Sequence, residues 1–188
     1  MFFKLLLAFS PWLAFLFIAS GSLFHLKIGL AVGLVLCVVM GITRLHRGII
    51  LWVGLLFFSS ALLAVAGFNS MWTARHMGII ANGAMAAATW LSIIIRKPFT
   101  MDYAREHTDP SLWKSPLFIR TNIIITAVWG LTFTFNTILA WGKMEQFILP
   151  GLAYEIITYT ALISAVYFSS WYPAHVHRAG AHGCNPCV

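Results

Sequence analysis

Three polar side chains interrupt long apolar stretches of the sequence, namely Asn82, Asn136 and Glu155. Polar groups are costly in hydrocarbon, so within a membrane they usually face the protein interior or a water-filled cavity. With helices of alternating direction, all three fall in the outer half of the bilayer. Such a cluster would line a small cavity that holds a cation, a proton or a polar substrate group. The other interpretation, which we favour, is that Glu155 pairs with water, Lys143 or Arg75 at the membrane rim.

A second concentration of reactive side chains lies near the C-terminus. Five candidate metal ligands fall within thirteen residues: His175, His177, His182, Cys184 and Cys187. The two-residue gap between the cysteines is typical of zinc sites and of thiol redox pairs. A structural zinc site usually joins two ligand pairs across a small folded unit, and this segment is short. We therefore predict a disordered tail, with zinc or copper binding, palmitoylation and a redox role as alternatives.

No familiar catalytic signature accompanies these residues. General acid–base catalysis asks for a second acid, a nucleophile or a histidine beside a lone carboxylate such as Glu155. The sequence contains no phosphate-cradling glycine loop, no serine elbow and no His-Glu-x-x-His pair. We therefore predict that the chain is not an enzyme and that it has a transport or structural role.

The elements that must hold these residues are membrane-spanning helices. Of the 188 residues, 60% are hydrophobic and 9% are charged, a balance that a water-soluble domain of this length does not present to solvent. A spanning helix needs about 20 mostly apolar residues. Six such runs occur, at residues 3–20, 27–43, 49–68, 77–95, 118–141 and 147–171. We predict an all-α polytopic bundle of about six transmembrane helices over residues 1–172, followed by a tail over 173–188.

The first run has two interpretations. Lys4 precedes the apolar stretch and small residues follow it at 19–21, as in a cleaved signal peptide. Pro11 and Trp12 lie in the middle of the stretch, where they fit a kinked or interfacially anchored helix better. We therefore expect a retained helix, with cleavage as the alternative.

The basic residues predict the orientation, because loops rich in Lys and Arg stay cytoplasmic. Three fall on one side of the predicted bundle: Lys27, Arg75 and Lys143. Nine fall on the other side: Lys4, Arg44, Arg47, Arg96, Lys97, Arg105, Lys114, Arg120 and Arg178. Both termini are therefore expected in the cytoplasm. Basic residues that face anionic headgroups also account for the net charge of +7, so the charge does not indicate a nucleic-acid partner.

Small residues cluster on one face in two of the runs. The second run carries Gly29, Gly33, Cys37 and Gly41, and the fourth carries Gly83, Ala84, Ala87 and Ala88. Small faces let helix backbones approach closely, which favours helix association in lipid. We predict that these two faces pack on each other and that Cys37 is a packing residue.

The longest predicted loop, residues 96–117, holds three of the five acidic residues. Pro98 predicts the end of the preceding helix. Thr100 is expected to cap a short helix through Glu106 that lies along the membrane surface. Asp109 precedes a proline and predicts a further helix start. We expect a solvated, lipid-touching connector, with a partner-docking loop as the alternative.

Aromatic residues near predicted helix ends are expected to anchor in headgroups, because their rings have an apolar body and a polar tip. They are Trp52, Trp72, Trp90, Trp113, Trp141, Trp171, Tyr103 and Tyr172. Trp129 lies well inside the fifth run and is the exception. We predict that it is a packing residue or a hydrogen-bond donor within the bundle.

The order of these features resembles the bacterial intracellular septation protein A family and its inner-membrane-spanning relatives. The resemblance covers residues 9–171 and is carried by Pro11, Arg44-Leu45-His46-Arg47, Arg96-Lys97-Pro98, Trp113, Asn122, Trp129-Gly130 and Phe133. It implies a bacterial inner-membrane protein linked to envelope maintenance and cell division, which acts through contacts with other membrane proteins or with itself. The family supplies no catalytic residues. The sequence departs from it at residues 97–105 and in the tail, which leaves a different role open.

Overall fold

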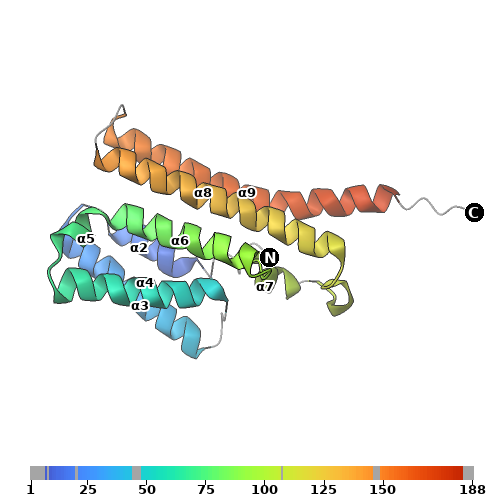
Figure 1. Ribbon diagram of the computed structural model, residues 1–188, viewed down its shortest axis with the longest axis horizontal. Helices are drawn as coiled ribbons and strands as arrows, with labels where there is room; N and C mark the ends of the chain where they lie inside the picture. Colours follow the sequence, from blue (N-terminus) through green and yellow to red (C-terminus); the bar gives the residue numbers. More distant parts are fainter. Residues whose placement is uncertain are drawn as a thin grey trace, which may run out of the picture.

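The computed structural model describes residues 7, 9–19, 21–43, 48–106, 108–145 and 149–183, with side chains up to Val176. This part of the chain is helical and contains no strand, so the all-α fold class is confirmed for it (Figure 1). The longer helices are α2 (Ser10–Ile18), α3 (Leu23–Ile42), α4 (Ile49–Leu62), α6 (Met77–Ile94), α8 (Pro116–Met144) and α9 (Gly151–Gly183). The short segments are η1 (Leu63–Gly67), α5 (Met71–Arg75), α7 (Thr100–Arg105) and η2 (Pro110–Leu112).

Five helices are long and apolar enough to cross a membrane, and they match the last five predicted runs. They are Leu23–Ile42, Ile49–Gly67, Met77–Ile94, Pro116–Met144 and Gly151–Val176. The described helix of the first run, α2, has nine residues. At 1.5 Å per residue it covers about 14 Å, roughly half of a hydrocarbon core about 30 Å thick. The count of six spans therefore stays a prediction.

Successive helices run in opposite directions, so the helix ends gather at two ends of the bundle (Figure 1). The end of α2, the start of α3, α5 and the facing ends of α8 and α9 lie at one end, which we name the cavity end. The other end holds the end of α3, the start of α4, α7 and the C-terminal part of α9, and we name it the basic end. Packing of α6 against α8 and α4 joins the α8–α9 pair to the remaining helices.

Aromatic side chains from α2 take part in two hydrophobic cores. At the start of α2, the ring of Phe9 stacks on Trp129 of α8 with 4.9 Å between centroids. Further along, Phe15 meets the ring of Phe58 from α4 edge-on at 5.7 Å. Trp129 is buried and donates its Nε1–H to Ser169 Oγ at 2.9 Å. The predicted role of Trp129 inside the bundle is confirmed.

The small face of α3 packs against α2 and α4, so the predicted pairing with α6 is wrong. A Cβ added to Gly33 would lie 2.5 Å from Cε1 of Phe58. A Cβ added to Gly29 would lie 3.1 Å from the Cβ of Ala19 at the end of α2. The notch left by a missing side chain accepts a ring or a methyl group as readily as a backbone. Spacing along one helix therefore does not identify the neighbour that fills it.

The remaining small residues have separate neighbours. Cys37 is buried against α4, as expected of a packing residue, whereas a Cβ on Gly41 would be 3.6 Å from the nearest side chain of α4. On α6, a Cβ on Gly83 would lie 3.9 Å from Cγ2 of Thr137, so Gly83 faces α8. Ala84 packs against the core that contains the buried residues of α3 and α4, and Ala87 is exposed.

One face of the helix α7 is buried against α8. The predicted cap is wrong, because the Thr100 hydroxyl does not cap the helix; it donates to the backbone oxygen of Asn122 at 3.0 Å and lies 2.8 Å from Thr126 Oγ1. Tyr103 is 4% exposed, so its predicted role as a headgroup anchor is also wrong. The placement of α7 along the membrane surface stays a prediction.

The predicted helix limits within this loop are confirmed. Arg96 adopts a left-handed φ of 57° just after α6 ends, and Pro98 follows. Asp109 begins η2, where its side chain accepts a hydrogen bond from the backbone N–H of Ser111 at 2.8 Å. Backbone-level signals of this kind depend on neighbours in sequence, which explains why they could be predicted.

The last helix runs through the predicted start of the tail. Pro173 lies inside α9 and the helix continues to Gly183, so the predicted disorder is wrong over that stretch. Proline lacks the N–H and crowds the carbonyl one turn earlier. Membrane helices tolerate this where neighbouring groups compensate. Ser169, one turn before Pro173, donates its hydroxyl to the Ala165 backbone oxygen at 2.8 Å.

Candidate functional site

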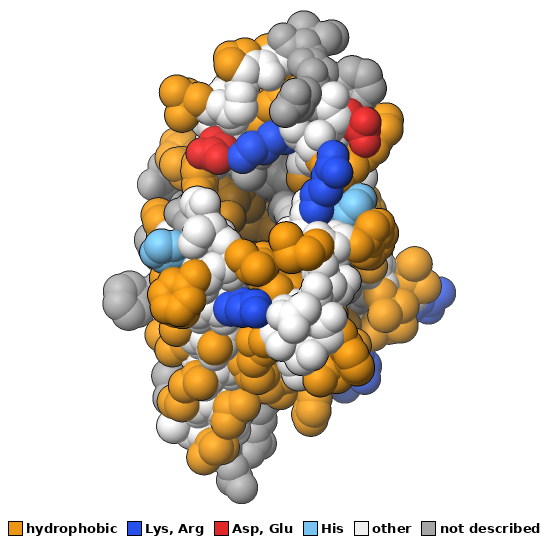
Figure 2. All heavy atoms as spheres, turned by 90° about the vertical axis from the view of Figure 1, so that its left-hand side faces the viewer, with side chains coloured by type: hydrophobic (Ala, Val, Ile, Leu, Met, Phe, Trp, Pro, Cys, Tyr) orange, Lys and Arg blue, Asp and Glu red, His pale blue; other side chains and the backbone are white. Residues whose placement is uncertain are grey.

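A cavity of about 580 Å³ opens at the cavity end of the bundle. Its walls come from the end of α2, the start of α3, α5, and the facing parts of α6, α8 and α9. Figure 2 looks onto this end and shows the hollow, with charged side chains around part of its rim and hydrophobic ones over much of the surrounding surface. Four of these helices are long enough to cross a membrane, so the cavity lies among the spanning segments.

The structure brings the three predicted polar residues together on the cavity wall. Asn82 of α6, Asn136 of α8 and Glu155 of α9 all line it. Asn82 donates its Nδ2–H to the backbone oxygen of Gly78 at 2.9 Å, so part of its hydrogen-bonding capacity is used within α6. Their common location follows from the alternating helix directions, whereas what the cavity binds stays a prediction.

The rim of the cavity carries more positive than negative charge. Lys143 Nζ lies 2.7 Å from Glu155 Oε1, and the two side chains are 46% and 51% exposed. This ion pair is the alternative that the sequence offered for Glu155, and exposed pairs contribute only about 0–1 kcal/mol. Arg75 also lines the cavity, and among the described residues it has no hydrogen-bond or ion-pair partner. Within the described residues, the Arg75 guanidinium therefore faces the cavity without an anion paired to it.

Asn136 is buried on the cavity wall without a partner. Its side chain is 1% exposed, and neither Nδ2 nor Oδ1 is hydrogen-bonded within the described part of the chain. Leaving a buried polar group unpaired costs about 1–3 kcal/mol, and the great majority of such groups are paired. The described residues therefore leave the Asn136 amide without a hydrogen-bond partner at the cavity lining.

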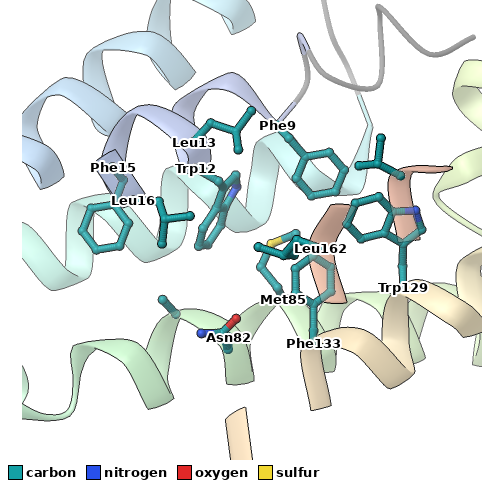
Figure 3. Close-up of a pocket in the computed structure, with 12 residues that line it drawn as sticks. Phe9, Trp12, Leu13, Phe15, Leu16, Asn82, Met85, Trp129, Phe133 and Leu162 are labelled. Carbon is teal, nitrogen blue, oxygen red and sulfur yellow. The ribbon is translucent and has the colours of Figure 1, made fainter. Parts of the chain in front are cut away.

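An apolar pocket of about 110 Å³ adjoins the cavity. Phe15, Leu16 and Asn82 line both spaces. Figure 3 shows Phe15 and Leu16 of α2 across the gap from Met85 of α6 and Phe133 of α8. An engineered apolar cavity of about 150 Å³ binds benzene, which has six carbon atoms. At the same volume per carbon atom, this pocket takes about four carbon atoms.

Positions along α8 order the levels of the cavity. Lys143 and Asn136 line the cavity, and Phe133 and Trp129 line the adjoining apolar pocket. At 1.5 Å per residue, Asn136 lies about 10 Å below Lys143, and Phe133 and Trp129 lie about 5 and 10 Å deeper still. Along α8 the lining residues therefore pass from a charged rim through an amide level to an aromatic floor.

The apolar floor was missed by sequence reasoning that considered polar residues alone. Positions 129, 133, 136, 140 and 143 recur at three- and four-residue spacing, which places them on one face of a helix. All five line the rim, the wall or the floor. This spacing is the sequence signal that identifies the complete wall around Asn136.

No family model, curated protein or solved structure matches the chain. The resemblance to the septation protein A family therefore rests on the residues of the sequence that carry it. The envelope-linked role that it implies stays a prediction.

A second buried asparagine lies at the basic end and was not predicted as a site residue. Asn122 is 2% exposed, and its Nδ2–H is donated to the Phe118 backbone oxygen at 2.8 Å. Its Oδ1 has no partner among the described residues. Asn122 lines a pocket of about 240 Å³ together with Thr108 and Pro173. An asparagine within a predicted span was the signal available for it.

The structure describes one side chain of the candidate metal site, His175. Its ring is exposed and stacks on Trp171 with 5.0 Å between centroids. The other candidate ligands, His177, His182, Cys184 and Cys187, lie outside the described side chains. Among those that are described, no group of three potential ligands lies close enough to hold a metal ion. Zinc or copper binding by the tail stays a prediction.

Proposed function

We propose that this chain is a non-enzymatic, multi-pass protein of the bacterial inner membrane that binds a small solute in the cavity. The cavity end faces away from the cytoplasm in this proposal. The orientation is supported by the basic residues: Arg96, Lys97, Arg105, Lys114 and Arg120 belong to segments at the basic end. The function belongs to the transport class and not to catalysis.

The observation that carries the proposal is Asn136. A polar residue that serves only in helix packing would have its hydrogen-bonding group paired within the bundle. The indole N–H of Trp129, which donates to Ser169 Oγ, is an example. The amide of Asn136 instead lies on the wall of a cavity that is open at one end, with both polar atoms unpartnered in the described chain. Since polar groups inside a membrane usually serve a solute path or a binding site, we assign binding to this cavity.

The closed basic end favours a binding cavity over an open pore. The floor residues Trp129 and Phe133 belong to a buried core that includes Phe99 and Tyr103 at the basic end. The pocket beside Asn122 shares no lining residue with the cavity or its floor. Transfer of a solute across the membrane would therefore require this core to rearrange.

Thiol labelling in intact cells tests the proposal. Cys37, Cys184 and Cys187 are first replaced, and then one cysteine is introduced on the cavity wall as Thr158→Cys. The matched control, Leu117→Cys, borders the pocket at the basic end. We expect a membrane-impermeant maleimide to react with Thr158→Cys in intact cells. The control should react only after the membrane is permeabilised.

The pattern of labelling separates the two parts of the proposal. Labelling of Thr158→Cys only after permeabilisation would reverse the orientation. Its failure to react in either condition, while Leu117→Cys reacts, would show that the cavity is closed to water and would overturn solute binding.

A role in envelope maintenance or cell division is a separate proposal, supported by the residues of the resemblance. Two of them, Asn122 and Trp129, are buried on α8, so they do not contact a partner from the surface. The partner surface would then lie on exposed helix faces. Gently solubilised membranes should yield a division or envelope protein together with this chain, and recovery of none would count against the role.

A further inference from the structure

The three levels of the cavity specify the chemistry of the solute. We infer that the cavity binds an amphipathic anion in which a carboxylate, a secondary amide and a short apolar group follow one another, as in N-acylated amino acids. The inference rests on the proposed function, because it names the solute class of the same cavity. The apolar group lies deepest, since the α8 residues that line the apolar pocket are the ones farthest along the helix from Lys143 at the rim.

The rim selects an anion. Arg75 has no partner among the described residues, and Lys143 is held only by an exposed pair with Glu155. The two cations outnumber the single carboxylate on the cavity lining. A guanidinium binds a carboxylate through two parallel hydrogen bonds, which gives Arg75 a geometric as well as a charge preference for such a group.

The amide level selects a group that both donates and accepts. Asn136 offers two N–H donors at Nδ2 and an acceptor at Oδ1, and all are unpartnered in the described chain. A second carboxylate would leave Oδ1 unpaired, and an ammonium would leave Nδ2 unpaired. A secondary amide supplies one N–H and one C=O and satisfies both sides. Asn82 lies on the facing helix α6, and its Oδ1 is an additional acceptor on the cavity lining.

The floor limits the size of the apolar group. Phe15, Met85 and Phe133 border a pocket of about 110 Å³, which corresponds to about four carbon atoms. Each methylene transferred from water to an apolar site contributes about 0.8 kcal/mol, or roughly fourfold in affinity. Affinity should therefore rise with chain length and stop rising once the pocket is filled.

A homologous series of N-acylglycines tests the inference. The probes are N-acetyl-, N-butanoyl-, N-pentanoyl- and N-octanoylglycine, added to the full-length protein in nanodiscs and measured by calorimetry against empty nanodiscs. We expect affinity to increase about fourfold per methylene up to N-pentanoylglycine and then to level off. Replacing the carboxylate by a carboxamide, or the amide by an ester, should each weaken binding about tenfold.

Variants assign each preference to its residue. Arg75→Gln should remove the difference between carboxylate and carboxamide probes, whereas Arg120→Gln at the basic end is the matched control and should keep it. Asn136→Leu should remove the difference between amide and ester probes. Equal binding of the carboxylate and carboxamide probes to the wild type, or equal losses in Arg75→Gln and Arg120→Gln, would overturn the inference.

The outcome is distinguishable from a failure of the proposed function. If Thr158→Cys is labelled from outside but no N-acylglycine binds, the cavity is open and the solute class is wrong. If Thr158→Cys is not labelled in either condition, both the proposed function and this inference fall. Binding that is unchanged in both Arg75→Gln and Asn136→Leu would place the probes elsewhere on the protein and overturn the inference.

Discussion

The buried hydroxyls at the basic end and the buried amide of Asn136 at the cavity end differ in their hydrogen bonding. At the basic end, Thr100 of α7 is hydrogen-bonded to the Asn122 backbone oxygen at 3.0 Å and to Thr126 Oγ1 at 2.8 Å, and both threonines are fully buried. At the cavity end, Asn136 is buried to the same degree, and no described residue pairs with its amide.

The difference between paired and unpaired buried polar groups indicates which parts of the molecule can bind a ligand. The buried side-chain atoms without a partner, among the residues that the structure describes, belong to Trp12, Asn122 and Asn136. Each of these three residues lines a pocket. Paired groups such as Thr100 and Thr126 instead hold helices together. Unpaired polar atoms therefore mark the hollow parts of the bundle, and paired ones mark its packed parts.

The largest expected effect comes from the layer that separates the two ends. Trp129→Ala removes the ring that stacks on Phe9 and the donor to Ser169. Loss of a buried aromatic side chain costs about 3–5 kcal/mol, which we expect as a fall in the free energy of unfolding in detergent. Trp52→Ala is the control, because Trp52 is 68% exposed and should change stability by less than about 0.5 kcal/mol. Equal losses would show that this layer does not stabilise the bundle.

A smaller effect is expected from the wall behind the cavity. Gly33→Ala would place a Cβ 2.5 Å from the ring of Phe58, which is boxed in by Trp12 and Phe15. Overpacking of this kind costs about 1–3 kcal/mol. Gly41→Ala on the same helix meets ordinary contacts at 3.6 Å and should be neutral or slightly stabilising. Thermal unfolding of the two variants in one detergent measures the contrast, and equal midpoints would contradict it.

A pair of substitutions tests the comparison of the two ends directly. Thr126→Val removes a hydrogen bond at the basic end and should cost about 1 kcal/mol. Asn136→Leu removes an amide that has no described partner, so it should leave the unfolding free energy of the solute-free protein unchanged or raise it. Chemical denaturation of both variants measures the direction of the change in the free energy of unfolding. A loss in Asn136→Leu as large as that in Thr126→Val would show that both ends are packed alike.

The sequence predicted the elements that depend on local composition. Five long apolar runs became helices of spanning length, because a helix satisfies its backbone hydrogen bonds within hydrocarbon. Alternating helix directions then brought Asn82, Asn136 and Glu155 to one cavity. The stop at Pro98 and the helix start at Asp109 depend on neighbouring residues and were also predictable.

The features that could not be predicted depend on which surfaces meet. Gly33 signalled a close approach, but the shape of Phe58 on α4 decides what fills the notch. The burial of Thr100 depends on acceptors contributed by Asn122 and Thr126, more than twenty positions away. The apolar floor at Phe133 arises only where α2, α6 and α8 come together. None of these partners is encoded in the local pattern of one segment.

The smallest expected effect is a pH dependence at the basic end. Burial raises the pKa of Asp102 above its ordinary value of 3.8, and Arg105 and Lys97 oppose the shift only in part. The folded state therefore holds the proton more tightly than the unfolded state, so this residue lowers the stability as pH rises from about 4 towards neutrality. Asp102→Asn should raise the thermal midpoint at pH 7, and the gain should vanish below pH 4.

Asp109 supplies a control of opposite sign on the same loop. Hydrogen bonds from the side chain and the backbone N–H of Ser111 hold the pKa of Asp109 below its ordinary value. Its ionised form therefore stabilises the folded state at neutral pH, and that contribution is lost as pH falls through the lowered pKa. Asp109→Asn should lower the midpoint slightly at pH 7 and leave it unchanged in acid. If both variants shift in the same direction, the Asp102 carboxyl is not desolvated in the folded state and the expected rise of its pKa is wrong.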